Sequence, residues 1–71
     1  MIKKQLDFAV FCIENIAEYM NIPGDVIYSK LTDESNLLDE YIIAFYDSLH
    51  TQSKEYIVAD ILEIMKKEGV L

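Results

Sequence analysis

The sequence is poor in residues that build disulfide-linked or metal-stabilised folds. It contains no arginine and no tryptophan, and it has one cysteine, one histidine, one proline and two glycines. Cys12 therefore has no partner for an intramolecular disulfide, and a lone cysteine with a lone histidine provides too few ligands for a zinc site. Because apolar residues flank Cys12, we expect a buried thiol in a reducing compartment.

Long hydrophobic runs are also missing. No uninterrupted apolar run approaches the roughly 20 residues that a membrane-spanning helix requires. Asp7 and Glu14 interrupt the apolar stretch near the amino terminus, and no small-residue cleavage site follows it, which argues against a signal peptide. We expect a cytoplasmic protein with no membrane partner.

Positive charge is scarce. Thirteen acidic residues against six lysines give a net charge of −7, and Lys30 is the only basic residue between Gln5 and Ser53. Such a field repels phosphate backbones, and the commonest base-reading side chain, arginine, is absent. We therefore expect no nucleic-acid partner. A small helical DNA-binding regulator is kept as an alternative function. An acidic surface suits either simple solubility or a basic protein partner.

Helical periodicity is what the chain does contain. A length of 71 residues allows a single domain, residues 1–71, and a hydrophobic content of 52% predicts a packed core. Apolar spacings of three and four predict a first helix over about Lys4–Met20, which Asn21 ends before Pro23 opens a short second helix. The main stripe of the first helix is Leu6, Ala9, Val10, Ile13, Ile16, Ala17 and Met20.

Two further helices are predicted after the polar loop Thr32–Asn36. The third covers about Leu37–Leu49, and the fourth runs from Thr51 or Ser53 to about Lys67. The stripe of the third helix is Leu38, Ile42, Phe45 and Leu49.

The predicted fold is all-α, a compact bundle of about four helices with the second one short. A strand over Tyr41–Tyr46 is plausible by propensity. We reject it because the helical period continues beyond it and no hairpin turn lies nearby. The residues predicted to share one core are Val10, Ile13, Ala17, Ile27, Leu38, Ile42, Phe45, Leu49, Ile57, Ile61 and Ile64.

Two groups of residues remain once this core is assigned. The first helix has a second apolar face, which predicts either a central helix packed on two sides or a homodimer surface. That face consists of Phe8, Phe11, Cys12 and Tyr19. A flank of the third helix and the adjoining start of the fourth predict a surface for a protein partner, although Tyr46 is equally suited to cover the core edge. This surface consists of Ile43, Tyr46, His50, Thr51, Tyr56 and Asp60.

Candidates for catalysis are few. Asp47 and His50 are three residues apart, a spacing at which they can share a metal ion or a proton. Two residues do not make a site, and a lone histidine at a helix end is more often a cap. We expect no enzymatic activity, no cofactor and no metal, with a minor metal-binding or hydrolytic protein as a further alternative.

Several strings of residues resemble a known family over nearly the whole chain. They are Phe11-Cys12-Ile13-Glu14, Gly24 with Ile27-Tyr28, Phe45-Tyr46-Asp47-Ser48-Leu49-His50-Thr51 and Tyr56-Ile57-Val58-Ala59-Asp60-Ile61. The family consists of short bacterial helical proteins catalogued as a domain of unknown function. The resemblance implies that members are often encoded near toxin-like ADP-ribosyltransferase domains, and hence an antitoxin or accessory role. The function we expect is a non-enzymatic protein-interaction module.

Overall fold

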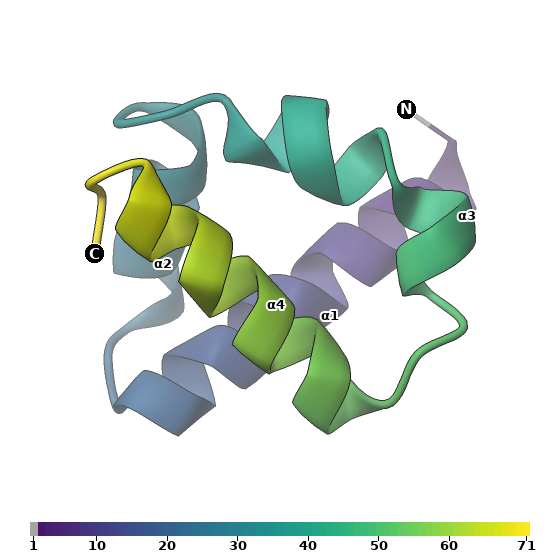
Figure 1. The fold of residues 1–71 in the computed structure, drawn as a ribbon, viewed down its shortest axis with the longest axis horizontal. Helices are drawn as coiled ribbons and strands as arrows, with labels where there is room; N and C mark the ends of the chain where they lie inside the picture. Colours follow the sequence, from purple (N-terminus) through teal and green to yellow (C-terminus); the bar gives the residue numbers. More distant parts are fainter. Residues whose placement is uncertain (1) are drawn as a thin grey trace.

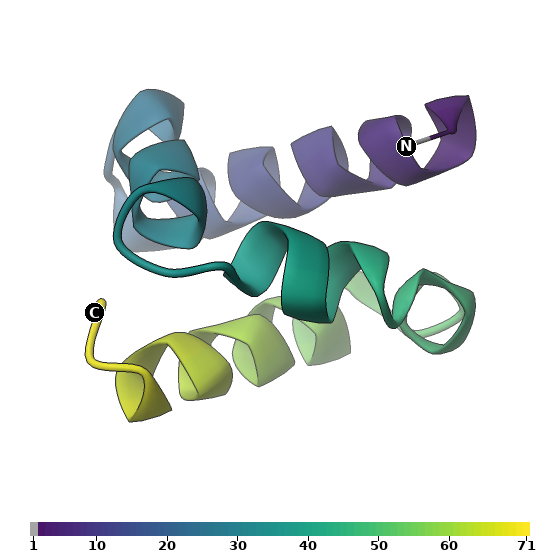
Figure 2. The same ribbon diagram turned by 90° about the horizontal axis from the view of Figure 1, so that it is seen from above.

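The computed structural model describes residues 2–71 and confirms the all-α prediction. Its helices are α1 (Lys3–Met20), α2 (Gly24–Thr32), the π-helix η1 (Leu38–Ile43), α3 (Tyr46–Leu49) and α4 (Lys54–Lys67). Figure 1 shows α4 crossing in front of α1, with η1 and α3 along one side of the pair. In the view from above, η1 lies between the levels of α1 and α4 (Figure 2). α1 contacts α2, η1 and α4, and η1 contacts α1, α2 and α3.

The helix ends follow the predicted stop and start signals. Asn21 takes a left-handed conformation at φ 56° and ends α1, and Pro23 precedes the first turn of α2. Ser53, rather than Thr51, caps α4, because its Oγ accepts a hydrogen bond of 3.1 Å from the Tyr56 amide. After α4, Gly69 adopts φ 73°, the left-handed conformation that glycine takes without steric cost. None of the helices within residues 2–71 is long and apolar enough to span a membrane.

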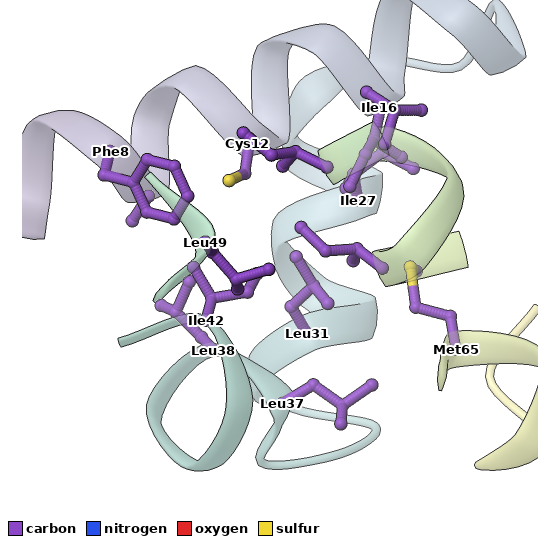
Figure 3. Packing of buried hydrophobic residues seen from close by; sticks show 14 of the residues in the cluster. Phe8, Cys12, Ile16, Ile27, Leu31, Leu37, Leu38, Ile42, Leu49 and Met65 are labelled. Carbon is purple, nitrogen blue, oxygen red and sulfur yellow. The ribbon is translucent and has the colours of Figure 1, made fainter. Parts of the chain in front are cut away.

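One continuous cluster of apolar side chains fills the interior, and ten of its residues are labelled in Figure 3. Every helix contributes to it, so the bundle is held together by one shared core. The buried residues are Phe8, Ala9, Cys12, Ile16, Ile27, Leu31, Leu37, Leu38, Ile42, Leu49, Ile57, Val58, Ile61, Met65 and Val70. Six of the predicted core residues are among them, namely Ile27, Leu38, Ile42, Leu49, Ile57 and Ile61.

The predicted core was wrong on α1. Val10 is 45% exposed, and Ile13 and Ala17 are only partly buried at the edge of the core. The buried face of α1 instead combines Ala9 and Ile16 of the predicted stripe with Phe8 and Cys12 of the second apolar face. α1 carries apolar residues on both faces, and periodicity does not tell which of the two the neighbouring helices cover. Ile64 on α4 is likewise only partly buried against the core.

The predicted third helix is divided into two pieces. In η1 the Ala44 amide donates to the carbonyl of Asp39, five residues back, at 3.2 Å. A bond of this kind adds one residue to the turn and shifts every following side chain around the helix axis. Tyr46 therefore takes the inward position predicted for Phe45, and Phe45 is 51% exposed.

Candidate protein-interaction surface

Tyr46 and His50 lie together in a column of aromatic rings. Tyr46 meets the Phe8 ring edge-on, with centroids 5.4 Å apart, and His50 stacks in parallel on Tyr46 at 4.4 Å. The His50 Nδ1 is 2.7 Å from the carbonyl oxygen of Tyr46. Because a carbonyl only accepts, Nδ1 carries the proton and His50 closes the end of α3. The pair therefore anchors α3 to α1.

The remaining residues of the predicted surface are dispersed. Ile43 is partly buried against the core. Thr51 donates its hydroxyl to the carbonyl of Ser48 at 2.9 Å and so completes the turn after α3. Tyr56 and Asp60 lie one turn apart on α4, and Asp60 accepts a hydrogen bond from Tyr41 of η1. The six predicted residues thus separate into an α3 group and an α4 group.

The α4 group belongs to a cluster that the sequence interpretation did not assemble. The Tyr41 ring packs against Phe45 with centroids 5.3 Å apart, while its hydroxyl bonds to Asp60. Tyr56, one turn before Asp60, is 52% exposed. We call Tyr41, Phe45, Tyr56 and Asp60 the aromatic surface. The spacing of four between Tyr41 and Phe45 was visible in the sequence, but it carries no sign that Phe45 is exposed while Tyr41 packs at the edge of the core.

The Tyr41 hydroxyl is held in its protonated form. Burial raises the pKa of Tyr41 to about 12, and the hydrogen bond to the Asp60 carboxylate adds to the rise. A neutral phenol donating to a carboxylate is a stable charge-assisted pair. The arrangement fixes the Tyr41 ring and joins η1 to α4.

Half of the predicted second apolar face of α1 is buried. Phe8 and Cys12 are buried inside the chain, whereas Phe11 and Tyr19 are exposed. Burial raises the pKa of the Cys12 thiol to about 12, so the thiol is protonated at neutral pH. The sequence predicted either a helix packed on two sides or a homodimer surface, and the burial of Phe8 and Cys12 agrees with the first.

The side chains suited to chemistry do not converge. Within the described part of the chain, no group of three or more histidine, cysteine or acidic residues is arranged to hold a metal ion. Asp47 and His50, the pair considered for metal or proton chemistry, are both exposed, and His50 uses its Nδ1 for the α3 carbonyl.

A groove lies on the other flank of α4, where it crosses α1. Its volume is about 380 Å³. Val58, Ala59 and Leu62 of α4 and Tyr19 of α1 supply its apolar lining. The polar lining consists of Asn15, Glu18, Lys54 and Glu55.

Comparison with known proteins identifies the family. No curated protein and no solved structure matches the chain. A family model described as "Protein of unknown function (DUF3791)" matches residues 7–68, which confirms the resemblance to a domain of unknown function. Because the match covers nearly the whole chain, from early in α1 to the residue after α4, the chain belongs to the DUF3791 family.

Proposed function

We propose that the chain is a non-enzymatic protein-interaction module that binds its partner through the aromatic surface. The observation that carries this proposal is Phe45, a large apolar side chain that the π turn leaves 51% exposed. π turns inside helices are frequent at functional sites. An exposed phenylalanine contributes nothing to a core, but it supplies apolar area when a partner covers it.

The surroundings of Phe45 suit it to binding. The hydrogen bond to Asp60 fixes the Tyr41 ring, and Phe45 packs on that ring. A side chain that is already ordered loses little entropy when a partner arrives. Tyr56 adds a second exposed aromatic ring, and aromatic residues dominate the binding energy of many interfaces.

Charge defines the class of partner. The net charge of −7 favours encounter with a basic protein surface, and opposite charges raise association rates more than they raise affinity. The family resemblance implies a toxin-like ADP-ribosyltransferase encoded nearby. We propose an antitoxin or accessory role toward such a protein, in which the acidic chain meets a basic cleft and the aromatic surface holds the complex.

The test is a binding measurement with the protein encoded beside this one. Calorimetry with purified proteins should give a complex that Phe45→Ala and Tyr56→Ala each weaken about tenfold or more, as expected for residues at the centre of an interface. Tyr28→Ala is the matched control, because Tyr28 is an equally exposed aromatic on α2. Tyr46→Ala is unsuitable because Tyr46 packs on Phe8. The absence of a complex, or equal effects of all three substitutions, would remove the aromatic surface from consideration.

Self-association, predicted for the face that consists of Phe8, Phe11, Cys12 and Tyr19, stays a prediction. Because Phe8 and Cys12 are buried, we propose a different part of α1 as its surface. Leu6 and Val10, at a spacing of four, are 52% and 45% exposed and form an apolar strip open to a second copy. Light scattering at micromolar concentration decides the matter. A dimer that Val10→Glu dissociates supports this strip, and a monomer at every concentration tested eliminates the homodimer.

A further inference from the structure

The groove between α1 and α4 is a second concave site, distinct from the aromatic surface. Val58 and Leu62 lie one turn apart on the α4 flank next to α1, whereas Tyr56 and Asp60 occupy the flank next to η1. Figure 1 shows the crossing of the two helices that bound the groove. Binding at one flank of α4 therefore leaves the other accessible.

The groove has an apolar interior and acidic residues at its margin. Val58 is almost fully buried, Leu62 is partly buried, and Tyr19, 73% exposed, adds an aromatic ring from the α1 side. Exposed carboxylates contribute from both helices, Glu18 on α1 and Glu55 on α4. Neither is used by the three ion pairs found among residues 2–71. Both carboxylates are available to a cation on a bound molecule.

The size of the groove restricts what it holds. About 380 Å³ is at the lower end of the roughly 300–1,000 Å³ typical of ligand sites. Such a space accommodates one or two apolar side chains. Another chain can insert an apolar side chain between α1 and α4. The residues on either side of that side chain then lie beside Glu18 and Glu55.

We propose that the groove binds a peptide segment of a basic partner, in which a leucine-like anchor side chain is flanked by lysine or arginine. The apolar lining takes the anchor, and Glu18 and Glu55 pair with the flanking cations. Lys54 partly offsets the local negative charge, but the surrounding chain carries −7. A second copy of this chain is the poorer occupant of the groove, because it has only six lysines and no arginine to pair with Glu18 and Glu55.

The test is an NMR titration of the ¹⁵N-labelled full chain with synthetic peptides. The probe is an acetylated and amidated heptapeptide of alternating lysine and leucine. One control peptide replaces every lysine by glutamate, and another replaces every leucine by glycine. We expect the lysine–leucine probe to shift the amide signals of Tyr19, Val58 and Leu62, and both control peptides to leave them in place.

Variants of the chain separate the groove from other surfaces. Ala59 is exposed, so Ala59→Trp fills the groove without disturbing the core and should abolish these shifts. The double variant Glu18→Gln, Glu55→Gln should weaken the probe about three- to tenfold, the effect of losing two exposed ion pairs. Glu14→Gln, one turn before Glu18 and outside the groove, should not. Phe45→Ala should leave the probe unaffected, so failure here is distinguishable from failure of the aromatic surface. Absent shifts, equal shifts from the glutamate peptide, or binding that ignores Ala59→Trp would overturn the proposal.

Discussion

α4 and the segment Leu37–Leu49 have similar apolar patterns but fold differently. Both carry apolar residues at spacings of three and four. α4 is a regular helix, and Ile57 and Ile61 of its predicted stripe are buried, while Ile64 is partly buried. In the other segment Leu38, Ile42 and Leu49 of the stripe are buried, but Phe45 is exposed. An apolar pattern therefore predicts that a segment is helical, but a single longer turn changes which side chains are buried.

The hydrogen bonds account for the difference. The α4 helix begins with the Ser53 cap and keeps regular α-helical geometry to Lys67. η1 has no side-chain cap, and the Ala44 amide reaches back to Asp39 instead of Glu40. Two contacts accompany the extra residue in the turn. Tyr46 packs against Phe8, and Tyr41 donates a hydrogen bond to Asp60.

The largest effects should come from the fully buried isoleucines of the two regions. Ile61→Ala in α4 and Ile42→Ala in η1 should each lower the free energy of unfolding by about 2 to 5 kcal/mol, because both side chains are completely buried. Urea denaturation followed by circular dichroism measures both. A small effect at Ile42 alone would show that η1 is not part of the common core.

Much of this organisation was predictable, and the exceptions have physical causes. The helix ends at Asn21 and Pro23 were predictable because the signals are local. The placement of Phe45 and Tyr46 was not, since it depends on the length of one turn. The groove and the Tyr41–Asp60 bond join residues far apart in the sequence, and spacing within one helix holds no information about such contacts.

A smaller effect is expected at Tyr46, which joins the irregular segment to α1. Tyr46→Ala should cost about 1 to 3 kcal/mol, less than a fully buried aromatic, because Tyr46 is partly exposed and loses mainly its contact with Phe8. Chemical denaturation gives the value, and Tyr28→Ala, at an exposed position of α2, serves as the control. An effect no larger than that of the control would show that Tyr46 does not hold α3 to α1.

Tyr41 should link stability to alkaline pH. At neutral pH, Tyr41→Phe removes one hydrogen bond and should cost about 1 kcal/mol. Since folding raises the Tyr41 pKa from 10.0 to about 12, the folded state keeps a proton that the unfolded chain loses first. The resulting stabilisation is complete below pH 10 and is lost as the pH rises from 10 to 12.

Urea midpoints across this pH interval test the linkage. Between pH 10 and 12 the parent chain should lose stability more steeply than Tyr41→Phe. The other tyrosines and the lysines titrate in both proteins, so the difference between the two profiles reports on Tyr41. Parallel profiles would show that the Tyr41 phenol is not held by Asp60.

The most direct test of the account is the unfolding free energy of Phe45→Ala. A regular helix over Leu37–Leu49 would bury Phe45, and its removal would then cost about 3 to 5 kcal/mol. With the π turn, Phe45 contacts mainly the Tyr41 ring and half of it faces solvent, so we predict a loss of about 1 kcal/mol or less. This loss should be smaller than that of Tyr46→Ala measured in the same denaturation series. A loss of 3 kcal/mol or more at Phe45, with little effect at Tyr46, is about the size a buried aromatic gives and would contradict the register shift on which the aromatic surface rests.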